Sequence, residues 1–123
     1  SFEYSFLSTG AADFQLFSMV MTIEAMIDFT KVDNFFEAIS VLNAFMPLGY
    51  FAVMPNEDEG ASIIYKAQIP LVNDVTDELL YKQVNLAIAQ FVNLGVKFIS
   101  PLAGFAAGRY ESSVLFELLG IAR

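Results

Sequence analysis

The stretch FSMVMTIEAMIDF, residues 17–29, alternates with the period of a β-strand. Its odd positions are all apolar: Phe17, Met19, Met21, Ile23, Ala25, Ile27 and Phe29. Its even positions are more polar on the whole: Ser18, Val20, Thr22, Glu24, Met26 and Asp28. A helix would spread the odd positions around its circumference, whereas a strand places them all on one face. The stretch therefore predicts a long strand with one buried face.

The residues before this strand predict its partner in a β-hairpin. Residues 1–8 alternate, with Phe2, Tyr4 and Phe6 on one side and polar residues on the other. Residues 9–13, TGAAD, have the composition of a turn. We expect these two strands to pair.

After residue 29 the period changes to that of an amphipathic helix. The apolar positions are Val32, Phe35, Phe36, Ile39, Leu42 and Met46. Thr30 is a candidate N-cap, and Pro47 and Gly49 end the helix. A second hairpin follows, with strands at residues 50–54 and 61–71, and Pro70 indicates that the last of these ends at a sheet edge.

The longest predicted helix begins after a cap at Asp74 or Thr76, and Pro101 and Gly104 kink or end it. Its apolar stripe is Leu80, Val84, Ala87, Ile88, Phe91, Gly95, Phe98 and Ile99. Residues 111–121 predict a short terminal helix. Residues 1–123 are thus expected to form a single α+β domain. Its order is β-β-α-β-β-α plus a short C-terminal helix, with an antiparallel sheet made from two β-hairpins and two main helices.

Composition argues against catalysis. The chain has no histidine and no cysteine, and therefore lacks the commonest general base, the thiol nucleophile and the soft metal ligands. No catalytic, cofactor-binding or metal-ligating residue is predicted, and we expect a protein that is not an enzyme and takes no cofactor. The formal charge of -8 argues against nucleic acid and against anionic membrane surfaces.

Two apolar windows are candidate membrane spans. Residues 38–56 contain two prolines and change period, and residues 86–108 are broken by Pro101. A span needs about 20 apolar residues in one continuous element. We therefore expect a soluble cytoplasmic protein with no membrane partner, and the absence of cysteine suits a reducing compartment.

Apolar residues that fall on the outward side of these elements are the candidate partner-binding residues. They are Leu7, Val20, Met26 and Ile64 on the strands, and Leu86, Val92 and Val96 on the long helix, where Leu79 and Leu94 also lie off the main stripe. Isolated surface hydrophobes are common and are the simpler alternative. Because 56% of the chain is hydrophobic, we favour an interface with a partner.

The passage LNAFMPLGYF, residues 42–51, resembles the "LN…PLG-aromatic" passage of the YbjN family, bacterial proteins that share the fold of type III secretion chaperones. The flanking order of elements and residues 96–108 are also similar, so the resemblance covers most of residues 14–108. It implies a small acidic α+β protein, usually dimeric, that binds protein. Chaperones of this fold hold an extended stretch of a client against hydrophobic patches. Asn43, Pro47 and Gly49 are expected to serve a turn.

From these observations we expect a non-catalytic protein-binding module, chaperone-like or regulatory. It would be a homodimer that uses the outer side of the long helix or the open sheet face, with a possible protein client. An alternative is a small hydrophobic-ligand-binding protein or enzyme with an apolar pocket between sheet and helices. A third is a structural subunit of a larger assembly.

Overall fold

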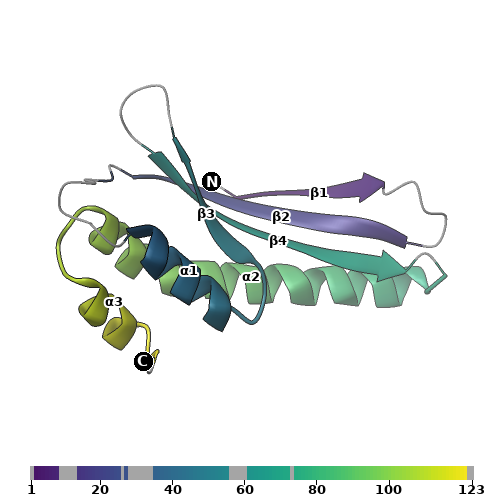
Figure 1. The fold of residues 1–123 in the computed structure, drawn as a ribbon. Coiled ribbons are helices and arrows are strands. Elements are labelled where there is room, and N and C mark those ends of the chain that lie inside the picture. Colours follow the sequence, from purple (N-terminus) through teal and green to yellow (C-terminus); the bar gives the residue numbers. More distant parts are fainter. Residues whose placement is uncertain are drawn as a thin grey trace.

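A computed structural model of the chain describes residues 2–8, 14–25, 27, 35–55, 61–72 and 74–121. Within these ranges an antiparallel sheet lies over the helices (Figure 1). The elements in chain order are β1 (Phe2–Ser8), β2 (Phe14–Ala25), α1 (Phe35–Phe45), β3 (Tyr50–Pro55), β4 (Ala61–Val72), α2 (Asp77–Ala106) and α3 (Ser112–Leu118). The α+β class and the order of elements are those predicted. The predicted turn at residues 9–13 and the cap at Thr30 lie outside the described residues.

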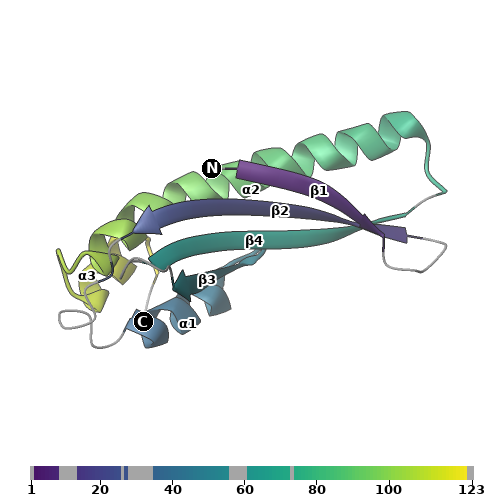
Figure 2. The same cartoon turned by 90° about the horizontal axis from the view of Figure 1, so that it is seen from above.

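The strand order β1-β2-β4-β3 joins the two hairpins through their long strands. Seen from above, β2 and β4 run side by side along the middle of the sheet and α2 runs along beneath it (Figure 2). β2 was expected at residues 17–29 but spans Phe14–Ala25. It ends at Ala25 because its partner β4 begins at Ala61, which is the residue paired with Ala25.

Alternation along the strands produces one buried face. Phe17 and Met19 of β2 are paired with Ile69 and Ala67 of β4, and all four point toward the helices. Paired residues lie on the same face of a sheet. The odd positions of β2 therefore form the core side, as the period predicts.

Three stacked aromatic rings join the sheet to its helices. The ring of Tyr65 lies 4.4 Å from that of Phe91 on α2 and 4.8 Å from that of Phe51 on β3, measured between ring centroids. Its hydroxyl donates a hydrogen bond of 2.5 Å to the carbonyl of Leu48. α2 comes close to the sheet at Gly95, where a Cβ atom would stand 2.7 Å from the sulfur of Met21.

α2 begins where its cap predicts and continues further than expected. The Thr76 hydroxyl accepts a hydrogen bond of 3.3 Å from the Leu79 amide. The expectation that Pro101 or Gly104 kinks or ends the helix is wrong about its end, since α2 runs to Ala106 with Pro101 inside it. The Pro101 carbonyl accepts a hydrogen bond from the Tyr110 hydroxyl, and the Tyr110 ring covers Gly104. These contacts hold the final turn against the chain that follows.

The turn between α1 and β3 needs glycine. Gly49 has φ +78°, and a Cβ there would stand 2.5 Å from the Lys66 carbonyl oxygen. Gly120 has a similar φ of +70° but nothing within 4 Å of the Cβ position. Left-handed backbone costs an L-residue about 1–2 kcal/mol.

We expect Gly49→Ala to lower the free energy of unfolding by more than Gly120→Ala, which pays only this backbone cost. The additional clash at Gly49 should add about 1–3 kcal/mol. Urea unfolding followed by circular dichroism measures both variants. Equal losses would show that the turn moves freely away from β4.

Burial raises the pKa of the Tyr65 hydroxyl from 10.0 to about 12. Between these values the unfolded chain loses the proton before the folded chain does, so the folded state loses stability as the pH rises. We expect the free energy of unfolding of the wild type to fall between pH 10 and 12, and that of Tyr65→Phe to fall less steeply. At pH 7 Tyr65→Phe should cost about 1 kcal/mol for the lost hydrogen bond. Parallel alkaline profiles of the two proteins would contradict this assignment.

Candidate functional site

Among the described residues, no group of three or more acidic side chains is placed to hold a metal ion. Burial also raises the pKa of Tyr110, more than a backbone hydrogen bond at Phe105 and the nearby Arg109 lower it. The Tyr65 hydroxyl donates to the Leu48 carbonyl in the turn before β3, and the Tyr110 hydroxyl donates to the Pro101 carbonyl inside α2. Exposed apolar residues are the remaining candidates for a functional site.

α2 carries several of the exposed large apolar residues. Leu79, Leu86 and Val96 are 45%, 71% and 65% exposed, and we call them the outer stripe of α2. The chain has no acidic residue between Glu78 and Glu111, and no charge at all between Lys82 and Lys97. The outer stripe thus lies on a segment free of the acidic charge that dominates the rest of the chain.

A groove of about 300 Å³ begins at this stripe. Its lining consists of Leu48, Ile69, Pro70, Leu71, Val72, Gln83, Leu86, Ala87 and Gln90. It follows the end of β4 where β3 no longer pairs with it, because β3 begins opposite Lys66. Leu86 belongs both to the groove and to the outer stripe.

Two of the candidate residues point away from the helices, as predicted. Val20 and Ile64 are partly exposed on the open face, the side of the sheet that carries the even positions of β2 and β4. Polar residues interrupt the open face, since Val20 pairs with Lys66 and Ile64 with Thr22. It does not form one continuous apolar patch.

The structure does not bring the seven candidates together. Val20 and Ile64 lie on the open face, whereas Leu86 and Val96 lie on α2 beneath the opposite face (Figure 2). Leu7 pairs with Leu16 in the sheet, but its side chain, and the whole of Met26, lie outside the described residues. Val92, the third candidate on α2, is partly buried and packs against the core. Its position, four residues after Ile88 and three before Gly95, continues the buried stripe.

Tyr4 and Phe6, which the period places on the same side of β1 as Phe2, are exposed. They lie on the helix-covered face of β1, beside the Phe17 ring at 5.8 and 5.0 Å, yet are 59% and 52% exposed. α2 makes most of its contacts with β2 and β4, and on β1 it meets Phe2, whose ring lies 5.7 Å from that of Phe91. The sequence signal for this exposure is the position of the strand in the topology, since the first strand of a hairpin often lies at a sheet edge.

On the β3 side of the sheet, the edge of β3 and the edge of β4 beyond it each carry one residue that hinders further pairing. On β3, the Asn43 side chain accepts from the Phe51 amide at 2.7 Å and donates to the Phe51 carbonyl at 3.0 Å. On β4, Pro70 lies beyond the end of β3, as predicted for an edge, and has no amide hydrogen to offer. Among the described strands, β1 is left with an edge that neither device protects.

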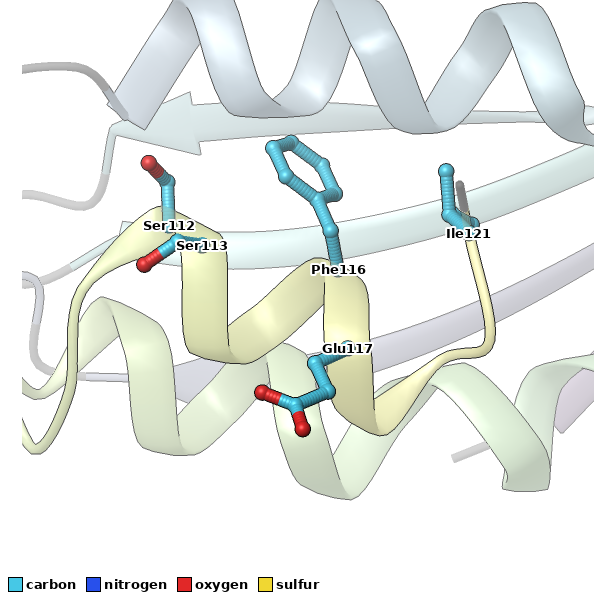
Figure 3. A pocket seen from close by; sticks show the side chains of 5 residues that line it. All are labelled: Ser112, Ser113, Phe116, Glu117 and Ile121. Atoms are coloured by element: carbon cyan, nitrogen blue, oxygen red, sulfur yellow. The ribbon is translucent and has the colours of Figure 1, made fainter. Parts of the chain in front are cut away.

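A second hollow, of about 360 Å³, lies along α3 (Figure 3). Ser112, Phe116 and Ile121 point to one side of α3, while Glu117 points away from them. The lining offers two hydroxyls and one carboxylate, and no described base activates either serine. We assign it no chemistry.

α2 is also the one described helix that is long and apolar enough to cross a membrane by length and composition. In this structure Ala87, Phe91, Gly95 and Phe98 are buried against the rest of the domain. A core helix of a soluble protein satisfies the same criterion, and 28% of the most apolar stretch of α2 is buried in this domain.

The chain was compared with known proteins in three ways. No family model, no curated protein and no solved structure matches it.

Proposed function

We propose that this chain is a non-catalytic, cytoplasmic protein-binding protein, chaperone-like or regulatory, that works as a homodimer. The observation that carries the proposal is the outer stripe of α2, an exposed apolar surface on an otherwise acidic chain. Large exposed apolar residues that cluster on one element are typical of sites for protein partners. The resemblance of residues 42–51 to the YbjN family supports the same class of function.

Energetics favour a partner at this surface. Burying a Leu or Val side chain fully is worth about 1.5–3 kcal/mol, so Leu86 and Val96 together can supply a substantial part of a binding free energy. The absence of acidic residues from residue 79 to residue 110 removes like-charge repulsion with another acidic protein. Lys82 and Lys97 border the uncharged segment and can pair with acidic groups of a partner.

A small-ligand function has no comparable observation in its favour. The layer between the middle of the sheet and α2 is filled by the stacked rings of Phe51, Tyr65 and Phe91. The groove at Leu86 lies at the border of this layer and opens to solvent. A protein segment suits such a surface better than a small molecule, which needs an enclosing pocket.

We expect the double variant Leu86→Lys with Val96→Lys to lose protein partners that the wild type binds. Partners retained by the tagged wild type and lost by the variant would be purified, and their Kd values measured for both. Lysines at these positions should weaken binding at least tenfold, or about 1.4 kcal/mol. Ser40→Lys with Gln68→Lys adds the same charge at exposed positions elsewhere and should leave Kd unchanged.

Sedimentation equilibrium tests the homodimer, with an expected mass of twice 13.6 kDa. A wild-type monomer at tens of micromolar would contradict it. Equal affinities of wild type and the lysine variant for every partner would remove the role of α2. A co-purified small ligand in native mass spectrometry, with no protein partner, would overturn the proposed function.

A further inference from the structure

We propose that two copies of this chain join edge to edge through β1. The two β1 strands would pair antiparallel about Ser5, and the two four-stranded sheets would become one continuous sheet. The inference rests on the proposed homodimer and names the surface that forms it, which leaves the outer stripe of α2 free for another protein.

The hydrogen bonds of Asn43 fix which way each backbone group points. Because Asn43 binds both the amide and the carbonyl of Phe51, these groups point away from β4. The Phe51–Tyr65 pair is therefore a non-hydrogen-bonded pair, and the backbone groups of Tyr65 point toward β2. The side to which the backbone amide and carbonyl point alternates from one residue to the next along a strand. In a hydrogen-bonded pair, the amides and carbonyls of the two residues point toward each other.

The same alternation can be followed across the sheet to β1. Tyr65 is opposite Met21, so the backbone amide and carbonyl of Met21 point toward β4 and those of Val20 point toward β1. Val20 is opposite Glu3, so the backbone amide and carbonyl of Glu3 point toward β2. It follows that the amides and carbonyls of Phe2, Tyr4 and Phe6 face outward, where the described sheet has no further strand. β1 thus presents an uninterrupted row of donors and acceptors.

β1 has none of the features that protect a sheet edge. It contains no proline or glycine, and its one charged residue is Glu3. Its outward-facing backbone is flanked by the exposed rings of Tyr4 and Phe6 on the helix side. Aromatic residues are the side chains that form favourable cross-strand pairs.

Repulsion between the two Glu3 charges favours one register for the pairing of two copies. Pairing centred on Ser5 matches all seven residues of β1 and sets Tyr4 opposite Phe6 of the other copy. Each Glu3 then faces position 7, so the two glutamates are four residues, or roughly 13 Å, apart along the strands. This exceeds the Debye length of about 8 Å at physiological salt. A register centred on Tyr4 would halve that separation and bring the two charges within it.

A single cysteine tests this register in a chain that has no cysteine of its own. The backbone groups of Ser5 point toward β2, so the two Ser5 residues form a non-hydrogen-bonded pair, with Cα atoms about 4.5 Å apart. That distance lies within the range of a disulfide. We expect Ser5→Cys to become mostly a disulfide-linked dimer under mild oxidation.

Glu3→Cys is the matched control. Residue 3 is exposed on the same strand and the same face, but its two copies lie too far apart to bridge. It should remain largely unlinked under the same conditions on non-reducing gels. Circular dichroism establishes that both variants are folded.

A charge exchange provides a second readout that needs no oxidation. Tyr4→Lys with Phe6→Lys, and Tyr4→Glu with Phe6→Glu, should each be monomeric alone because like charges face each other across the pair. Mixed together they should form a heterodimer, in which each lysine faces a glutamate. Sedimentation of the separate and mixed proteins measures this.

The outcomes separate the interface from the homodimer itself. A dimeric wild type in which Ser5→Cys links no better than Glu3→Cys, or in which both charged variants stay dimeric, would overturn the β1 interface and leave the homodimer standing. A monomeric wild type would overturn both. A monomer that binds another protein, and loses that protein on Tyr4→Lys with Phe6→Lys, would replace the second copy by a client strand.

Discussion

The ring of Tyr65 holds the sheet and the helices in one arrangement. It stacks on Phe91 of α2 and Phe51 of β3, and its hydroxyl binds the Leu48 carbonyl in the turn after α1. Around it, Gly95 lets α2 approach the sheet and Gly49 lets the turn approach β4. One side chain of β4 therefore contacts α2, β3 and the turn between α1 and β3. The position of α2, and with it the surface that α2 exposes, depends on this centre.

The parts of the fold that could be predicted are those governed by a local period. The odd positions of β2, from Phe17 to Met21, are buried because alternation needs only one apolar layer beneath the sheet. The stripe through Ala87, Phe91, Gly95 and Phe98 is buried for the corresponding helical reason. Thr76 could also be predicted, since a cap depends on a hydroxyl three residues before a free amide.

The parts that could not be predicted depend on contacts between distant residues. Pro101 stays inside α2 because Tyr110 and the chain after the helix support its last turn, and no local pattern contains that support. Val92 is partly buried because residues beside the main stripe of α2 also pack against the core. Tyr4 and Phe6 have the period of core residues, but whether a helix covers them depends on where α2 crosses the sheet. Of the candidate interface residues, Leu86 and Val96 are well exposed, and Leu7 is the one that lies on the edge strand β1.

The amide of Asn43 has a consequence for assembly size. A β-sheet that can grow at both ends polymerises without limit, because each added copy presents a fresh surface for the next. Here the side chain of Asn43 occupies one end at Phe51, and Pro70 removes a donor from the neighbouring segment. A strand added on this side would have to displace the Asn43 side chain and would find no donor at Pro70. If two copies pair through β1, these two residues disfavour further growth at the opposite side and favour a finite assembly over a filament.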